Sequence, residues 1–545
     1  MQIARVTNEI TPRTVESAAL PEKQWQLWAL SVVSGALQVF VFPLPNWTFL
    51  CWIALAPLLL ALVRVGTARH QRTAKALTRG FLLGWVSGII FYAGSCYWVY
   101  HVMAIYGGLS APVAAGVLAL FCLYVGLIHG LFGALLAFVA SRPGWGRRAL
   151  LIAPFLWVAT EFVRARIIGF PWDLLGTVLV DNIPLSRLAT VTGVYGLSFE
   201  IALMNAALVM ILTGRRERRV LLLALFVLII GIVETGAYLE PPQSTASGTA
   251  RVVQQNIPLN LPWTPQLLDQ TFADLAKISV MQPGEGMPGD PLPDLIIWPE
   301  SPAPFFESDP RYRTELSGIA QKARAYVLAG SLGVVRDGSE TQEVFNSAEL
   351  VNPQGEFIAR YDKIHLVPFG EYVPFKDMFS FAKKLTREVG DFVPGTERLV
   401  LPVYSYKLGT FICYESIFPD EIRIFARDGA GVLVNISNDG WFGDTGAPIQ
   451  HLRMVRMRAI ENNRWVVRST NTGVSGSIDP FGRVVKQLRR NVRVGLDVPY
   501  GIVNTTTFYT RHGDWFAWCC LVISCAIISV GVLFLRSPFR TGRPS

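Results

Sequence analysis

The first 240 residues contain repeated apolar stretches that are long enough to cross a lipid bilayer. A helix needs roughly 20 apolar residues to span the hydrocarbon core. Such stretches lie near residues 25–42, 46–63, 80–102, 111–139, 149–165, 190–213 and 219–238, and another lies at 515–535. Only 16% of the residues are charged, against about 25% in a typical soluble chain. The sequence therefore predicts a membrane protein with about eight spanning helices.

Lys and Arg are concentrated in alternate loops between these stretches. They cluster after the second, fourth, sixth and last stretches, at 64–79, 142–148, 214–219 and 536–543. Because cytoplasmic loops carry the excess of Lys and Arg, both termini are expected in the cytoplasm and the long 240–510 segment outside. The net charge of +9 is then largely a topology signal and does not imply nucleic-acid binding.

From about residue 250, short β-rich runs alternate with stretches of helical composition. The helical stretches are 264–279, 311–326, 418–428 and 447–463, and "NPQGE" (352–356) and "DPFGR" (479–483) have the composition of hairpin turns. This alternation is typical of a layered α/β domain. We expect a membrane domain over 1–240, an extracytoplasmic α/β domain over 241–510, and a last spanning helix with a cytoplasmic tail over 511–545.

Cys413 is the only cysteine in the predicted extracytoplasmic domain, because the other six of the seven lie in apolar stretches. Cysteines within such stretches act as small apolar side chains. An unpaired thiol in an exported domain is a candidate reactive group. A buried structural cysteine is the alternative, and composition does not separate the two.

Two further candidate residues follow predicted strands. Glu300 ends "LIIWPE" and Lys363 ends "FIARYDK", just as Cys413 follows "GTFI". Open α/β sheets form active sites at such strand ends, although a surface acid and a solvated lysine are the simpler interpretations of each residue alone. Histidine is scarce here: His365 and His451 have no neighbouring set of metal ligands.

The blocks "WPES", "YDKIHLVPFGEYVP" and "CYES" resemble the catalytic blocks of the nitrilase (carbon–nitrogen hydrolase) superfamily. That resemblance implies an αββα sandwich with a Glu-Lys-Cys triad, on a multi-span α-helical membrane domain. The whole arrangement, with "GFPW" (169–172), "GVYGLSF" (193–199) and "QQNIP" (254–258), resembles the apolipoprotein N-acyltransferase family. By resemblance, Cys413 is the nucleophile that forms an acyl thioester, Glu300 the general base, and Lys363 the group that stabilises the oxyanion.

The same resemblance suggests four supporting residues. Glu371 and Glu415 match glutamates near the site, Tyr414 lies beside the nucleophile, and Trp263 matches a tryptophan associated with substrate access. The resemblance implies no cofactor and no metal. The implied partners are a phospholipid acyl donor, a diacylglyceryl-modified apolipoprotein acceptor and the lipid bilayer, and a monomer in a bacterial inner membrane with its catalytic domain in the periplasm is expected.

Several alternatives stay open at this point. An amidase or other hydrolase would use the same triad with water as acceptor, and a transporter or receptor could carry a degenerate enzyme-like domain. The segment 372–385 is either a lid that dips into the lipid interface or an ordinary amphipathic helix. Glu161, Arg164 and Arg166 either bind a lipid headgroup or pair with other residues at the interface. The stripe Arg453, Met454, Met457, Arg458 and Glu461 is interpreted as packing rather than a cofactor site.

Overall fold

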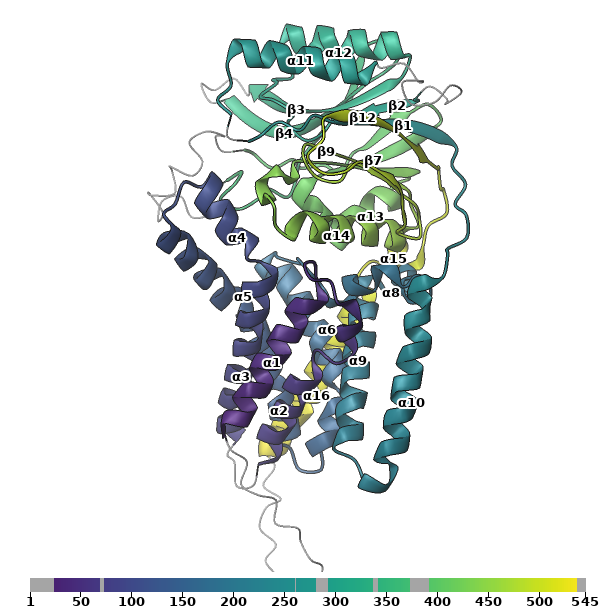
Figure 1. Cartoon of the computed structure of the whole chain (residues 1–545). Helices are drawn as coiled ribbons and strands as arrows, with labels where there is room; N and C mark the ends of the chain where they lie inside the picture. The colour runs from purple at the N-terminus through teal and green to yellow at the C-terminus, as the bar shows by residue number, and fades with distance from the viewer. Residues whose placement is uncertain are drawn as a thin grey trace, which may run out of the picture.

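The protein consists of a bundle of long helices with a layered α/β sandwich stacked on one end (Figure 1). The computed structural model describes residues 24–68, 73–259, 261–280, 293–336, 342–372 and 392–536. The predicted lid segment lies outside these residues except for Tyr372, and so do residues 281–292 of the Pro/Gly-rich loop 280–294, to which the sequence assigns no role.

The bundle is built mainly from the first half of the chain. Its long helices are α1 (Gln24–Val41), α2 (Ala56–Thr67), α3 (Thr73–Ser95), α5 (Ala111–Ala140), α6 (Ala153–Val163), α9 (Val194–Leu212), α10 (Arg216–Thr235) and α16 (Trp515–Arg536). Shorter helices connect them: η1 (Thr48–Trp52), α4 (Trp98–His101), η2 (Val102–Tyr106), η3 (Gly146–Leu151), η4 (Arg164–Ile168), η5 (Leu175–Asp181), α7 (Ile183–Ser186), α8 (Ala189–Thr192), η6 (Gly236–Tyr238) and α15 (Phe508–His512).

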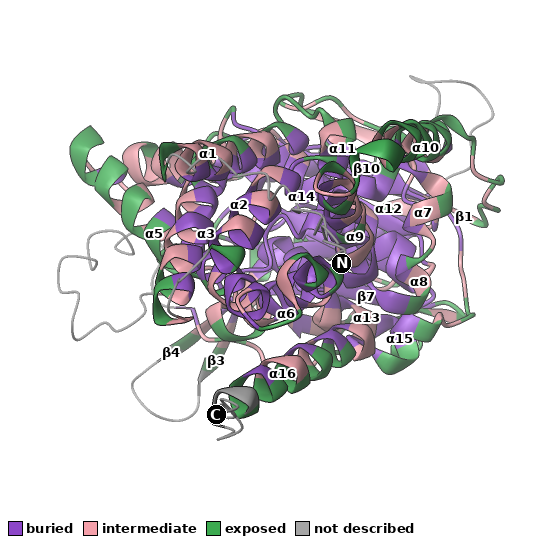
Figure 2. Cartoon of the chain, turned by 90° about the horizontal axis from the view of Figure 1, so that it is seen from below, coloured by how far each residue is buried: buried purple, intermediate pink, exposed green. Residues whose placement is uncertain are grey.

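Six helical stretches among the described residues are long and apolar enough to cross a membrane. They are Thr48–Thr67, Thr73–Ser95, Ala111–Ala140, Val194–Leu212, Arg216–Tyr238 and Trp515–Leu533. Only 11% of the α10 stretch and 17% of the α16 stretch are buried in the protein, and their exposed outer faces are apolar (Figure 2). Such faces suit contact with lipid.

Two predicted spans, 25–42 and 149–165, are not among these six stretches. Helix α1 carries Gln24, Gln26 and Gln38, which lower its hydropathy, and α6 has only 11 residues before η4 continues it. Both nevertheless run alongside the other bundle helices (Figure 1). Some polar side chains of α1 face other helices, since Ser31, Ser34 and Gln38 are buried.

The sandwich consists of two six-stranded sheets. The first has the order β12-β1-β2-β3-β4-β5 and the second β11-β10-β9-β8-β7-β6, with the central strands of each parallel. The strands are β1 (Gly248–Gln254), β2 (Leu295–Ile297), β3 (Tyr326–Arg336), β4 (Gln342–Val351), β5 (Phe357–Asp362), β6 (Val400–Val403), β7 (Tyr406–Ile412), β8 (Val432–Ser437), β9 (Val466–Thr470), β10 (Gly476–Ile478), β11 (Val484–Gln487) and β12 (Val494–Tyr500).

Four helices complete the layers. Helices α11 (Pro265–Ser279) and α12 (Pro310–Ala323) cover the outer face of the first sheet, and α13 (Pro419–Arg427) and α14 (Ala447–Asn462) lie between the second sheet and the bundle (Figure 1). These are the four helices that the sequence predicts, within a few residues. Both predicted turns are also confirmed, since 352–356 joins the antiparallel pair β4–β5 and 479–483 joins β10–β11.

The bundle and the sandwich share one hydrophobic core at their junction. Met454 and Met457 of α14 and Phe442 of η9 (Asp439–Phe442) belong to the same cluster of buried residues as the bundle helices. The predicted packing role of the α14 stripe is therefore confirmed.

Helices α3 and α5 approach each other at glycines. A Cβ on Gly133 would lie 2.2 Å from the carbonyl oxygen of Gly80, and one on Gly84 would lie 2.1 Å from that of His129. Small residues allow such close backbone approach between membrane helices.

We predict that Gly133→Ala lowers the stability of the bundle. The added methyl must push the α3 backbone away, and overpacking of this kind costs about 1–3 kcal/mol. Gly116→Ala on the same helix is the control, because a Cβ there meets nothing within 4 Å. The midpoint of thermal unfolding in detergent measures both; equal midpoints for the two variants would contradict the close contact.

Candidate active site

The structure brings the three strand-end residues of the sequence prediction to one place. Glu300 follows β2, Lys363 follows β5 directly, and Cys413 follows β7 as the first residue of η8 (Cys413–Ile417). The ammonium Nζ of Lys363 lies 3.1 Å from Oε1 of Glu300. Glu300 and Lys363 are also close enough to act electrostatically on the Cys413 thiol.

Glu371 and Asn346 complete this buried cluster. Lys363 Nζ lies 2.9 Å from Oε1 of Glu371, so the ammonium is held between two carboxylates. The Asn346 side-chain amide donates to both carboxylates, at 2.8 Å to Glu300 and 2.7 Å to Glu371. The backbone carbonyl of Asn346 also accepts the backbone N–H of Lys363, at 2.8 Å. Sequence reasoning missed Asn346; its signal is an amide side chain, next to Ser347, in the buried centre of β4.

Backbone groups hold the second oxygen of each carboxylate. The N–H of Asn438 donates to Glu300 Oε2 at 2.8 Å, and the N–H of Val367 donates to Glu371 Oε2 at 2.7 Å. Burial alone would lower the pKa of Lys363, but Glu300 and Glu371 raise that pKa well above its ordinary value. Lys363 is therefore a fixed cation within the site.

Cys413 lies on a sharp turn of the backbone and is buried. Its φ is +50°, in the left-handed region, and its exposure is 6%. Burial, followed by the Glu300 carboxylate, raises the pKa of the thiol well above its ordinary value, and Lys363 offsets this only in part. The buried environment thus favours the neutral form of the thiol.

The predicted supporting residues take different places. Glu415 does not contact the Lys363 ammonium: it accepts the N–H of Ile412 at 2.7 Å, the N–H of Ile364 at 2.8 Å and the hydroxyl of Tyr361 at 2.8 Å. Glu415 therefore ties the end of β7, next to Cys413, to the segment that carries Lys363. Burial raises the pKa of Glu415.

Tyr414 contacts the bundle, whereas Trp263 lies on the surface. The Tyr414 hydroxyl donates to the carbonyl of Gly169, in the "GFPW" loop of the bundle, at 3.3 Å. Trp263 precedes α11, is 39% exposed, and forms no hydrogen bond or ring contact with another described residue. The structure thus joins Tyr414 to the membrane domain and leaves Trp263 on the surface.

The charged residues at the end of α6 pair with protein groups. Arg166 forms ion pairs with Asp420 of α13 and Asp514 at the start of α16. Arg164 donates to the carbonyl of Trp172 at 2.7 Å, and Glu161 accepts the N–H of Leu175 at 2.8 Å. Of the two interpretations of these residues, the contacts support pairing at the interface.

In the described part of the chain, no group of three or more His, Cys, Asp or Glu residues could hold a metal ion.

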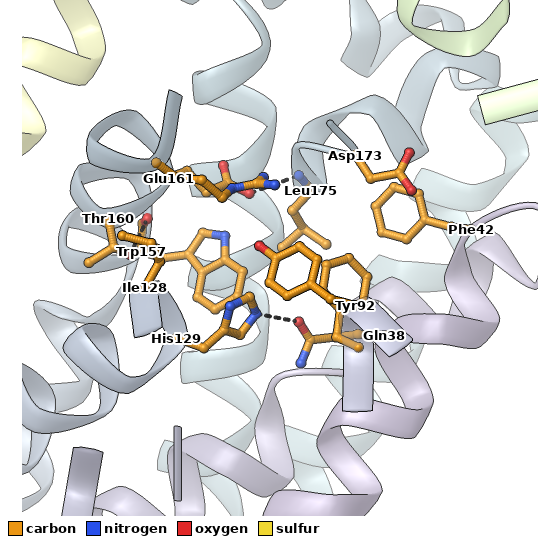
Figure 3. A pocket seen from close by; sticks show the side chains of 12 residues that line it. Gln38, Phe42, Tyr92, Ile128, His129, Trp157, Thr160, Glu161, Asp173 and Leu175 are labelled. Carbon is orange, nitrogen blue, oxygen red and sulfur yellow. Dashed lines mark hydrogen bonds between the residues drawn. The ribbon is translucent and has the colours of Figure 1, made fainter. Parts of the chain in front are cut away.

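A small cavity lies among the bundle helices (Figure 3). The space open to a water centre is about 10 Å³, so the cavity is too small for a phospholipid headgroup or an acyl chain. Five of its lining side chains have buried polar atoms without a hydrogen-bond partner: Tyr92, His129, Trp157, Glu161 and Asp173.

We predict that this cavity holds an ordered water molecule. A space of roughly this volume with two to four polar partners is what a buried water needs, and unpaired buried polar atoms are rare in native proteins. An experimental density map that resolves waters should show one here in the wild type. Tyr92→Phe removes one partner and should weaken that density, whereas an empty wild-type cavity would contradict the prediction.

Comparisons with known proteins cover nearly the whole chain. The model of the apolipoprotein N-acyltransferase N-terminal domain matches residues 34–207, and the carbon–nitrogen hydrolase model matches residues 249–495. An apolipoprotein N-acyltransferase from Geobacter metallireducens is 37% identical over 513 residues, covering 92% of this chain and 94% of that protein. One from Azotobacter vinelandii is 33% identical over 535 residues, covering 95% of this chain and 97% of that protein.

Among solved structures, an amidase of the nitrilase superfamily from Nesterenkonia is 20% identical, covers 51% of this chain and 98% of its own, and has a TM-score of 0.36. The two family models together match both the bundle and the sandwich, and the relatives match the chain over most of its length. The chain is a membrane protein that belongs to the apolipoprotein N-acyltransferase family.

Proposed function

We propose that this protein transfers a fatty acyl chain from a phospholipid, through a thioester on Cys413, to the α-amine of a diacylglyceryl-modified cysteine at the N-terminus of a lipoprotein. The observation that carries the proposal is the buried Glu300–Lys363–Glu371 cluster beside Cys413, at the junction with a membrane bundle. The names of the relatives support the same activity.

The first step forms the acyl-enzyme. Glu300 takes the thiol proton as the Cys413 sulfur attacks the ester carbonyl carbon of the donor. The developing oxyanion is stabilised by Lys363 and by the N–H of Tyr414, which lies in the first turn of η8, where backbone N–H groups lack intrahelical acceptors. The ester C–O bond then breaks, and the lysophospholipid oxygen takes the proton from Glu300.

The second step transfers the acyl group. The uncharged α-amine of the acceptor attacks the thioester carbonyl and gives a proton to Glu300. The C–S bond breaks, an amide forms, and the sulfur regains its proton. A thiolate leaves well from such an intermediate, so two moderate barriers replace one high barrier. Glu371 and Asn346 fix the Lys363 ammonium and the Glu300 carboxylate throughout.

The position of Cys413 favours a lipid donor over a soluble substrate. Tyr414, the residue after the nucleophile, contacts the Gly169 carbonyl of the bundle, and Phe418 beyond it belongs to the core of the bundle. An amidase that acts on soluble substrates has no use for this junction. Hydrolysis with water as acceptor is the alternative, because the triad chemistry is the same.

We further propose that the protein lies in a bacterial inner membrane with its sandwich in the periplasm and both termini in the cytoplasm. The ends of α2, α5 and α9, next to loops rich in Lys and Arg, lie at the end of the bundle opposite the sandwich (Figure 1). The positive-inside rule places that end in the cytoplasm. We expect a monomer and the domain division 1–240, 241–510 and 511–545.

Intact-mass measurement after incubation with phospholipid tests the two-step reaction. We predict an adduct of acyl mass on the wild type that is absent from Cys413→Ala, and that a diacylglyceryl-cysteine peptide removes with formation of an amide. Removal by water alone would favour the hydrolase. No adduct with any phospholipid would contradict the proposed donor.

Kinetic measurements on variants test the proposed roles of Lys363 and Asn346. Lys363→Met should lower kcat about a hundredfold or more, as expected for loss of an oxyanion donor. Asn346→Ala should lower kcat/KM by roughly tenfold or more, because each hydrogen bond to a charged group is worth about 1.5–3 kcal/mol. Gln354→Ala, an exposed amide in the turn after β4, is the control and should leave activity unchanged; equal losses in Asn346→Ala and Gln354→Ala would contradict this role.

A further inference from the structure

We propose that His451 is a positioning residue: it holds the backbone carbonyl of Cys413, and thereby aims both the nucleophile and the N–H of Tyr414 at the reacting ester. The proposal rests on the proposed function. His451 lies on α14 and is completely buried.

The first observation is the contact between the imidazole and the nucleophile's backbone. His451 Nε2 lies 3.0 Å from the carbonyl oxygen of Cys413. A carbonyl oxygen only accepts hydrogen bonds, so Nε2 carries the hydrogen and donates. The peptide unit is planar and trans, so the N–H of Tyr414 points away from the Cys413 carbonyl. Fixing the carbonyl on one side therefore fixes the N–H on the other.

The second observation is the rigid support behind the imidazole. His451 Nδ1 lies 3.0 Å from Asp439 Oδ1 and 3.1 Å from Arg468 Nη2, so both members of this buried ion pair contact the ring. Asp439 in turn accepts from Arg468 at 2.7 Å and from the Ser437 hydroxyl at 2.8 Å. Burial would raise the pKa of Asp439, but Arg468 and His451 hold that pKa well below its usual range. The imidazole is thus anchored to the buried Arg468–Asp439 ion pair.

The third observation is that Cys413 needs such a restraint. A non-glycine residue in the left-handed region costs about 1 kcal/mol or more and persists where the surroundings enforce it. The φ of Cys413 is +50°. On the N-terminal side Glu415 accepts the N–H of Ile412 at 2.7 Å, and on the C-terminal side His451 holds the carbonyl.

The fourth observation is that the membrane bundle covers the imidazole. The ring of Trp172, in the "GFPW" loop, stacks on His451 with centroids 6.0 Å apart and planes 17° apart. The Trp172 indole donates to Gln450, the neighbour of His451, at 2.9 Å. Trp172 therefore closes one face of the imidazole and excludes water from its bond to Cys413.

These contacts predict a specific kinetic signature. His451 acts through the peptide of Cys413, so its loss should slow the chemical steps and leave donor binding unaltered. Misaligning one oxyanion donor cannot cost more than losing it, which is about a hundredfold to a thousandfold. We therefore expect His451→Ala to lower kcat by about tenfold to a hundredfold, with KM for the phospholipid unchanged.

The experiment compares full-length variants in detergent–phospholipid micelles. The terminal amide of Gln can replace Nε2 as a donor, whereas the shorter Asn falls short of the Cys413 carbonyl. His451→Gln should therefore recover most of kcat, and His451→Asn should behave like His451→Ala. His512→Ala, at the exposed end of α15, is the control and should match the wild type. Thermal unfolding of each variant checks that it is folded.

Three results would overturn the proposal. They are a wild-type kcat in folded His451→Ala, equal kcat values in His451→Gln and His451→Asn, or a rise in KM with kcat unchanged. If His451→Ala does not fold, the comparison of Gln with Asn decides by itself. Failure of the proposed function is a different outcome, because the wild type would then form no acyl adduct.

Discussion

The burial of α14 between the second sheet and the membrane bundle is the constraint on which the rest of the structure depends. Fourteen residues of this helix are buried although it carries several charges. Each buried polar or charged side chain therefore needs a partner, and the partners come from both sides. Gln450 donates to the carbonyls of Pro43 and Ser95 in the bundle, and Glu461 accepts the N–H of Val194. On the sandwich side, Arg458 donates to the carbonyls of η8, the helix that begins with the nucleophile.

This arrangement explains why the reactive groups are buried and rigid. Lys363 is surrounded by acceptors that its own strand cannot supply, so β2, β4 and β5 must be in register for the cluster to exist. The Cys413 thiol lies where burial disfavours its charged form. Electrostatic preorganisation of this kind stabilises charge that develops in the transition state without reorganisation at that moment.

Much of the fold could be predicted from the sequence because its signals are local. The four sandwich helices begin with Pro at their first turns, and the hairpin turns carry Pro and Gly. The edge strands β6, β11 and β12 lack a comparable signal. Glu300, Lys363 and Cys413 could be located because each ends an apolar strand and lies in a recognisable block.

Asn346 and His451 could not be predicted, because their roles depend on partners far apart in the sequence. Asn346 bridges residues 46 positions before it and 25 after it. The role proposed for His451 depends on its contacts with Asp439, Arg468 and the carbonyl of Cys413. A single amide in a strand, or a single histidine on a helix, indicates none of this on its own.

The core that the bundle shares with the sandwich also sets an order of assembly. Phe418, Phe442 and Met454 are covered only when bundle helices are already in place. The sandwich therefore matures against a template that was inserted earlier in synthesis, and α16, which comes last, joins a bundle whose other helices are complete. Separated from that template, the sandwich would present an uncovered apolar underside and would tend to aggregate rather than act as an autonomous enzyme.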